Sequence, residues 1–224
     1  MPTNSIQLTA RDHALLRLIA QRRGVPLDLL ADELFLIDPL TGKRNRNPLR
    51  ACERRIRALA RADYVMFVRE YDGTRRRQVI VPANGTNGIG CGRASRRQVP
   101  RRTGVHHLKT QDAVSRLRRV IERRGGRVLR VQLDGELRAR ERRGHGRIRA
   151  APSRSIPDAV LNIEMPDFAG EVAVEFVTSK DTDRDITTKK TGFQRFGFTF
   201  WVADNERTAA RVRALTGETC SVLK

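Results

Sequence analysis

The chain has 224 residues and a formal net charge of +20, from 45 Lys and Arg against 25 Asp and Glu. An excess of this size repels itself in a compact fold unless a polyanion neutralises it, so nucleic acid is the expected partner. The three cysteines lack the spacing of a disulfide framework or a zinc site, and the absence of a secretory signal or a bilayer-length apolar run predicts a cytoplasmic protein with no membrane partner.

Two segments without apolar periodicity interrupt the pattern of helices and strands. The first, residues 82–103, is rich in Gly and in Asn-Gly turns, and the second, residues 138–155, is rich in Arg. Turn-rich basic segments are typical of linkers and loops. We therefore predict an N-terminal domain over residues 5–83, a linker over 84–103 and a second domain over 104–224 that contains the Arg-rich loop.

Three helices are predicted in the first domain. Thr9 and Asp12 resemble a capping box and begin the first helix, which Gly24 ends. Pro26 begins the second helix, and a third runs from about residue 48 to residue 62. Four apolar residues at spacings of 3, 4 and 3 predict the buried face of the third helix: Leu49, Cys52, Ile56 and Leu59.

The third helix also carries a stripe of arginines on another face, at spacings of 4, 3 and 4: Arg50, Arg54, Arg57 and Arg61. On a solvent-exposed helix face that contributes to stability, opposite charges are usually paired at i,i+4. This helix contains one carboxylate, Glu53, which is too few to pair with all the arginines of the stripe. The stripe therefore predicts contact with DNA, and its arginines suit either guanine edges or phosphates. The alternative is a plain solvated helix face.

A β-hairpin is predicted after the third helix. Its strands cover residues 64–70 and 77–81, on either side of a turn at Asp72-Gly73. Three helices followed by a hairpin predict a winged helix-turn-helix that binds double-stranded DNA, with the third helix in the major groove. The hairpin tip adds three further candidate DNA-binding residues: Arg75, Arg76 and Arg77.

The second domain is predicted to be an α/β sandwich. A helix at residues 110–124 precedes three strands, which are followed by a helix through Phe193, a fourth strand and a final helix at residues 206–215. The predicted strands cover residues 127–133, 159–164, 171–177 and 198–203. This order predicts helices that cover a mixed sheet.

Two acidic residues of the second domain are candidates for chemistry. Asp158 opens the second strand of this domain, and Glu175 lies on the less apolar face of the third. Carboxylates on neighbouring strands can chelate a hard divalent cation, and Mg²⁺ held there would orient water for phosphodiester hydrolysis. Asp158 and Glu175 are therefore the candidate metal ligands and catalytic acids. The alternatives are a turn residue at Asp158 and a half-exposed strand charge at Glu175.

The order of the motifs resembles a known family. Pro157-Asp158 and the later Val174 to Lys180 are similar to the PD-(D/E)xK nuclease core. The winged helix and five short motifs in this order resemble the replication-relaxation proteins of bacterial plasmids and mobile elements: residues 53–59, 105–108, 135–138, 156–159 and 174–180. The resemblance implies a DNA-binding role in replication, DNA relaxation or transfer, with a relaxase or a replication initiator as a protein partner.

The nuclease motif is incomplete in this sequence. It places a Lys two residues after its second acid, where this chain has Val177. Lys180 is the nearest residue that could replace this lysine, and it becomes the third candidate catalytic residue. Lys189 and Lys190 lie further along the chain and could also reach the site. Glu136 could add a further acid. The missing Lys favours a non-catalytic platform, with no cofactor required for DNA binding. A Mg²⁺-dependent DNA endonuclease and a winged-helix transcription repressor are the two alternatives.

Overall fold

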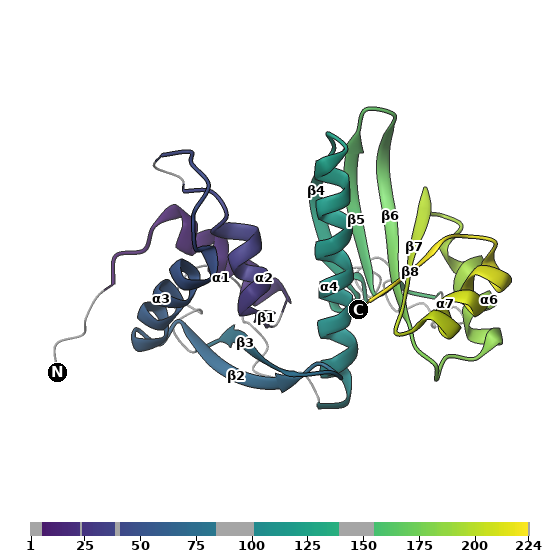
Figure 1. Ribbon diagram of the computed structural model, residues 1–224, viewed down its shortest axis with the longest axis horizontal. Helices are drawn as coiled ribbons and strands as arrows, with labels where there is room; N and C mark the ends of the chain where they lie inside the picture. The colour runs from purple at the N-terminus through teal and green to yellow at the C-terminus, as the bar shows by residue number, and fades with distance from the viewer. Residues whose placement is uncertain (1–5, 23, 39–40, 84–100, 139–154, 224) are drawn as a thin grey trace, which may run out of the picture. The chain divides into compact units, whose positions relative to one another are not determined.

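The computed structural model describes residues 6–22, 24–38, 41–83, 101–138 and 155–223. The chain divides into two compact units, Met1–Leu108 and Lys109–Lys224 (Figure 1). Each unit combines helices with a β-sheet, so the predicted α/β class is confirmed.

Three helices and a hairpin form the N-terminal unit, as predicted. The elements are α1 (Ala10–Arg22), α2 (Leu27–Leu34), α3 (Pro48–Arg61), β2 (Val65–Tyr71) and β3 (Arg76–Pro82). A two-residue strand, β1 (Val25–Pro26), pairs antiparallel with β3 and completes a sheet in the order β1-β3-β2. The sequence did not predict β1, because two residues are too few to show a period.

Side-chain caps set the starts of α1 and α3. Asp12 accepts hydrogen bonds from the N–H and from the hydroxyl of Thr9, each at 2.6 Å, which confirms the predicted cap. Asn47 accepts from the N–H of Arg50 at 3.0 Å. Pro48 lies in the first turn of α3, where a missing N–H costs no helical hydrogen bond.

The core of the N-terminal unit lies between the three helices and one face of the sheet. Its fully buried members include Leu15, Leu16, Ile19, Val25, Leu30, Cys52, Ile56, Leu59 and Ile80. Three of the four residues predicted for the buried face of α3 are among them. Leu49 is 46% exposed, so the prediction was wrong there. It lies in the first turn, and the spacing of residues does not show how far along a helix the core extends.

The long helix α4 (Arg101–Arg123) crosses the division between the two units at Leu108. The predicted start of this helix at Thr110 was therefore wrong. The predicted linker over residues 84–103 ends inside α4, and its residues 84–100 lie outside the described part of the chain. The apolar spacing that predicted the helix begins at Val114, so the earlier turns had too few apolar residues to be recognised.

The start of α4 packs against the rest of the N-terminal unit. His107 Nε2 lies 2.8 Å from the carbonyl oxygen of Arg22. At the hairpin turn, a Cβ atom on Gly73 would lie 3.4 Å from Val105. These contacts extend the N-terminal unit beyond its predicted end at residue 83.

A five-stranded mixed sheet forms the centre of the C-terminal unit, in the order β4-β5-β6-β7-β8. The elements are β4 (Arg127–Leu133), β5 (Ala159–Met165), β6 (Phe168–Val177), α6 (Asp183–Phe193), β7 (Phe198–Ala203), α7 (Glu206–Thr216) and β8 (Cys220–Val222). Strands β4, β5 and β6 are antiparallel, whereas β7 and β8 each run parallel to the strand before. The predicted order of elements is confirmed, with β8 and a short helical segment at residues 134–138 added.

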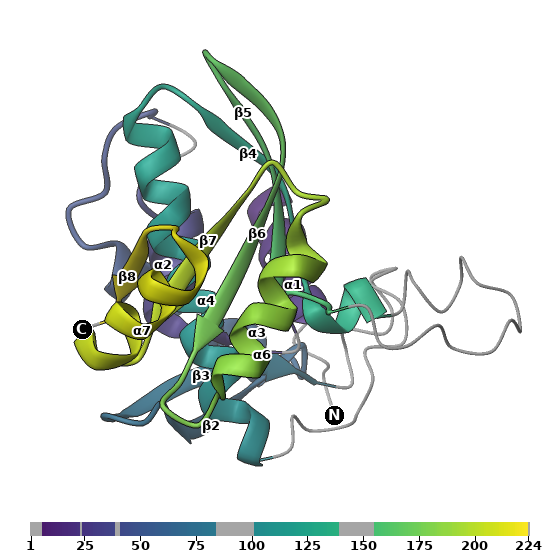
Figure 2. The ribbon, with the colours of Figure 1, turned by 90° about the vertical axis from the view of Figure 1, so that its right-hand side faces the viewer.

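Helices cover both faces of this sheet, and α6 and α7 lie together on one of them (Figure 2). One core joins α4 to the sheet through Val114, Leu117, Ile121, Leu161, Val174 and Phe176. The other joins α6 and α7 to the opposite face through Ile186, Phe193, Val212, Ala173 and Trp201.

Most of the predicted Arg-rich loop, residues 138–155, lies outside the described residues. Among the residues that the structure describes, no helix combines the length and apolar character that crossing a bilayer requires.

Candidate nucleic-acid interface and carboxylate–lysine cluster

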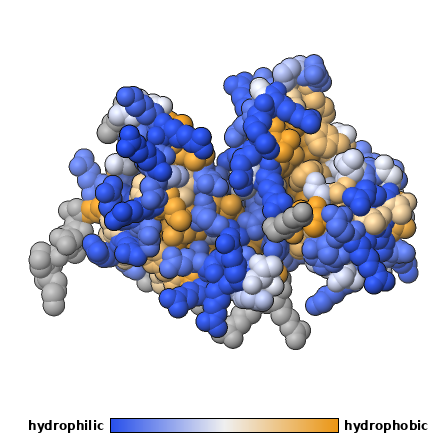
Figure 3. All heavy atoms as spheres, in the orientation of Figure 1, coloured by the Kyte–Doolittle hydropathy of each residue, from blue (hydrophilic) through white to orange (hydrophobic). Residues whose placement is uncertain are grey.

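The arginine stripe of α3 faces solvent. All four members are exposed: Arg50, Arg54, Arg57 and Arg61. The opposite face is held in the core by Cys52, Ile56 and Leu59, each 0% exposed. Arg57 also forms an exposed i,i+4 pair with Glu53 at 2.6 Å. Hydrophilic side chains gather over this part of the unit, with smaller hydrophobic patches between them (Figure 3). Core packing therefore fixes the direction in which the stripe is presented.

A fifth arginine of α3, Arg55, anchors the helix instead of joining the stripe. Its Nε donates to Asp12 Oδ1 at 2.7 Å, and its Nη2 donates to the carbonyl oxygen of Gln7 at 3.0 Å. Burial raises the pKa of the Asp12 carboxyl, but hydrogen bonds from Arg55 and Thr9 outweigh it, and the pKa lies below its usual value. The sequence did not reveal this pair, because its members lie 43 positions apart.

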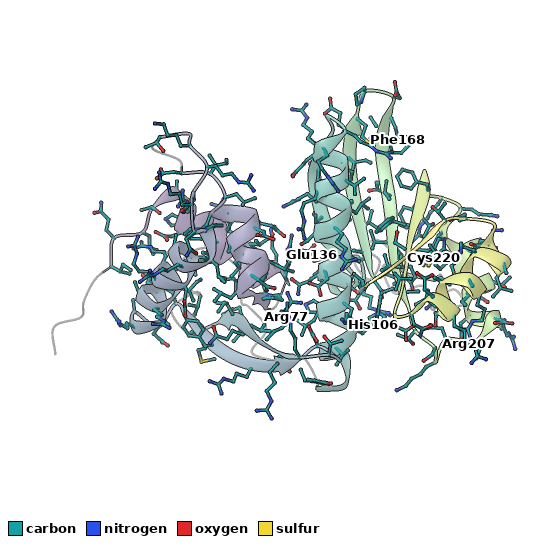
Figure 4. The ribbon with its side chains drawn as sticks, viewed as in Figure 1. Arg77, His106, Glu136, Phe168, Arg207 and Cys220 are labelled. Atoms are coloured by element: carbon teal, nitrogen blue, oxygen red, sulfur yellow. The ribbon has the colours of Figure 1, made fainter. Side chains whose placement is uncertain are left out.

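The arginines at the hairpin tip have different environments. Arg75 is 68% exposed and Arg76 is also exposed. Arg77 is buried, and its Nη2 donates to both carboxylate oxygens of Asp28 in α2 at 2.8 Å (Figure 4). Asp72 lies 3.8 Å from Arg77 Nη1. The predicted DNA-binding role of Arg77 is therefore corrected to a buried ion-pair network. The reason is that successive strand residues point to opposite faces of the sheet.

Asp158 and Glu175 lie side by side where β5 begins. The N–H of Asp158 donates to Glu175 Oε2 at 3.1 Å, and the N–H of Phe176 donates to Asp158 Oδ2 at 2.9 Å. The antiparallel pairing of β5 with β6 brings the two acids together. Glu175 is 2% exposed, which excludes the alternative of a half-exposed strand charge.

A lysine of α6 reaches the same place. Lys189 Nζ lies 2.8 Å from Glu175 Oε1 and 2.7 Å from Asp181 Oδ1. We refer to Asp158, Glu175, Asp181 and Lys189 as the carboxylate–lysine cluster. It ties α6 to β6 and to the turn that follows β6.

Lys180, the predicted third residue of the site, has a different position. It is exposed in the turn after β6, and its N–H donates to Thr178 Oγ1. The sequence contained a sign that favoured Lys189, because this residue lies three positions after Ile186 and four before Phe193. Both of those residues are buried. Residues separated by three or four positions share a helix face, so Lys189 also faces the sheet.

Burial and charge shift the pKa values in the cluster. Burial raises the pKa of Glu175 to about 8, and Asp158 adds to the rise while Lys189 opposes it. Burial lowers the pKa of Lys189, but Glu175 and Asp181 more than offset this effect, and the net shift is upward. Lys189 is therefore a stable cation, and the raised pKa of Glu175 means that protons would compete with a bound cation for this carboxylate.

The cluster offers the type of ligand that Mg²⁺ accepts. Proteins commonly hold Mg²⁺ with one or two carboxylates, while water and phosphate complete the coordination. Asp158 and Glu175 supply that number. In the described part of the chain, no group of three or more His, Cys, Asp and Glu side chains could hold a metal ion. Glu136 is half-buried in the helical residues 134–138 that follow β4 (Figure 4). Asp158 and Glu175 are the residues that could hold Mg²⁺, although Lys189 and the N–H of Asp158 already contact the two oxygens of Glu175. The set does not fit a closed structural metal site.

Comparison of this chain with protein-family models, curated proteins and solved structures gave no match. Inferences about function therefore depend on the geometry of α3, the hairpin and the carboxylate–lysine cluster.

Proposed function

We propose that the N-terminal unit is a winged helix-turn-helix that binds double-stranded DNA. The observation that carries this proposal is the exposed arginine stripe of α3, whose opposite face is locked in the core. A helix presented in this way suits the major groove, with its basic face toward the DNA. The element order α1-β1-α2-α3-β2-β3, in which β1 pairs with β3 of the hairpin, supports the assignment. Arg75 and Arg76 extend the cationic surface onto the hairpin.

A fluorescence-anisotropy titration of a labelled duplex with the full-length protein tests this function. Replacing Arg50, Arg54 and Arg61 together by Ala removes three exposed charges of the stripe and leaves the Arg55–Asp12 pair intact. We expect the affinity to fall by about 100-fold, because a good arginine contact contributes about 1 kcal/mol or more.

The matched control removes the same charge elsewhere. It replaces three exposed arginines of the C-terminal unit by Ala: Arg124, Arg184 and Arg207. This variant should keep most of the affinity of the wild type. Equal losses in the two variants would mean that net charge alone attracts DNA, and the winged-helix proposal would then fail.

The proposal includes a cellular setting. The resemblance to replication-relaxation proteins supports a role in replication, relaxation or transfer of a plasmid or mobile element, with a relaxase or a replication initiator as partner. Tighter binding to plasmid origin or transfer-origin fragments than to unrelated duplexes of equal length would support this setting. Equal binding to both kinds of fragment would oppose it.

A metal-dependent DNA endonuclease is the second candidate, and Lys189 is the observation that favours it. The motif lysine is missing at Val177, but Lys189 supplies an ammonium group 2.8 Å from Glu175. Asp158 and Glu175 would hold Mg²⁺, which supplies Lewis-acid activation of water and phosphate. Lys189 would stabilise negative charge on the phosphate, a contribution of about 10²-fold or more in rate for an electrostatic group of this kind.

Incubation of supercoiled plasmid with the protein and Mg²⁺ or Mn²⁺ tests the second candidate. The wild type should nick the plasmid, whereas Lys189→Gln and Asp158→Asn should not. Lys190→Gln is the control, because it removes a neighbouring charge on the same helix. If the wild type leaves the plasmid intact with both metals, the cluster is an ion-pair network that joins α6 to β6, and the endonuclease candidate is rejected.

A further inference from the structure

One face of the β2–β3 hairpin alternates aromatic and basic side chains. Phe67, Arg69 and Tyr71 occupy every second position of β2, so they share one face of the strand. Gln78 and Arg76 of β3 pair with Arg69 and Tyr71 and extend the same face. We refer to these five residues as the hairpin face.

The hairpin face lies open to solvent. Phe67 is 38% exposed and Tyr71 is 57% exposed, and the three polar members are exposed as well. Val65 and Ile80 continue this face toward the base of the hairpin, where both are buried in the core. The exposed segment therefore begins where the helices no longer cover the sheet. Large apolar side chains that remain exposed together often mark a binding surface.

We propose that the hairpin face stacks on unpaired bases next to the duplex bound by α3, so that the protein prefers DNA in which a duplex meets a single strand. This proposal rests on the DNA-binding function proposed above. Phe67 and Tyr71 are four residues apart in β2, which is about 13 Å along the strand or about four nucleotide rises, so the two rings can stack on different unpaired bases. Arg69 lies between the two rings along β2, and Arg76 lies opposite Tyr71 on β3. The two arginines can therefore neutralise phosphates on either side of Tyr71. Aromatic rings combined with cations are the usual means of binding single strands.

The charge of the hairpin face favours unpaired nucleotides over a second copy of this chain as its partner. Both ionisable side chains that flank the rings are arginines, and the face contains no carboxylate. A second copy of the chain would bring these positive charges toward each other, which is unfavourable. Unpaired nucleotides offer phosphates to the arginines and free base surfaces to the rings, whereas the bases of an intact duplex are already stacked on each other.

The test compares a blunt duplex with the same duplex extended by a single-stranded tail, in anisotropy titrations of the full-length protein. The wild type should bind the tailed duplex about tenfold more tightly, the size expected from stacking one or two bases. Tyr71→Ala should remove most of this preference and leave the affinity for the blunt duplex unchanged. Met66→Ala is the matched control, because Met66 is 50% exposed on the opposite face of β2 and should affect neither affinity.

A tryptophan variant gives a direct measure of stacking. The one native tryptophan, Trp201, is 0% exposed in the C-terminal unit, so Tyr71→Trp adds the only exposed indole. Its fluorescence should be quenched by the tailed duplex and not by the blunt one, with the tail preference retained. Equal wild-type affinity for both duplexes overturns the stacking proposal and leaves the DNA-binding function standing. Failure of the wild type to bind either duplex rejects the DNA-binding function itself.

Discussion

Arg54 and Arg55 are neighbours in α3 with different environments. Arg54 is exposed in the stripe, whereas Arg55 pairs with Asp12, which is 1% exposed. Removing one partner of a fully buried pair costs about 3 to 5 kcal/mol. Because Arg55 is itself partly exposed, we expect Arg55→Ala to lower the free energy of unfolding of the N-terminal unit by about 2 to 3 kcal/mol. Arg54→Ala should change it by less than about 0.5 kcal/mol. Hydrogen exchange of α1 and α3 amides in urea measures both effects.

Arg55→Ala should lose more stability than Arg54→Ala, but Arg54→Ala should lose more affinity for DNA. Arg54→Ala should weaken binding to a duplex without loss of stability, since Arg54 belongs to the exposed stripe that we propose contacts DNA, whereas Arg55 is paired with Asp12. Adding Asp12→Asn to Arg55→Ala should restore part of the lost stability, because no unpaired buried charge would remain. An Arg55→Ala protein as stable as the wild type would show that the pair does not hold α3 in place.

Glu175 predicts a pH dependence for metal binding under the endonuclease candidate. Burial raises its pKa to about 8, so below that pH its proton must leave before a cation binds. The affinity for Mg²⁺ should therefore rise with pH, by up to about tenfold per pH unit, and level off above pH 8. Calorimetric titrations across this range measure the rise. Glu175→Gln should remove the dependence, and a wild-type affinity that stays constant below pH 8 would contradict the assignment.

Under the DNA-binding proposal, the exposed arginines of α3 and of the hairpin tip would act together as one cationic element. The four arginines of the stripe together with Arg75 and Arg76 are exposed. If each contacts a phosphate, the logarithm of the binding constant should fall against the logarithm of the salt concentration with a slope of about −5. Replacing Arg50, Arg54 and Arg61 by Ala should make the slope less steep by about 2.7. Anisotropy titrations at several salt concentrations measure it, and an unchanged slope would place these arginines away from DNA.

The molecule as a whole divides within α4, and this changes which fragment should fold independently. Residues 101–108 belong to the N-terminal unit, in which Val105 lies next to Gly73 and His107 contacts the end of α1. A fragment of residues 1–112 should therefore melt at a temperature at least about 8 °C higher than a fragment of residues 1–84. The contacts of Val105 and His107 should together contribute about 2 kcal/mol, which shifts the melting temperature of a small domain by about this amount.

Circular dichroism melts of the two fragments test this division. A duplex titration shows whether each fragment retains the N-terminal function. Equal melting temperatures would mean that the start of α4 adds nothing to the N-terminal unit, and the predicted end at residue 83 would then be adequate.

Most elements of the fold could be predicted from the sequence, because their causes are local. The period of the apolar residues predicted the three N-terminal helices, and the Asp72-Gly73 turn predicted the hairpin. The same local spacing predicted the exposed stripe of α3. It could not predict β1 or the start of α4, because these segments are ordered by contacts with residues distant in sequence.

Tertiary structure decided which charged residues are available for function. Arg76 and Arg77 are adjacent and chemically identical, yet only the position of Asp28 in α2 shows that Arg77 is a buried partner. Lys180 is nearer to Glu175 in sequence, but Lys189 meets it because α6 packs across the sheet. The sequence alone established the residue types and their local periods. The pairing of distant charges depends on burial and on the path of the chain, because a charge in the interior requires a partner within a few ångströms.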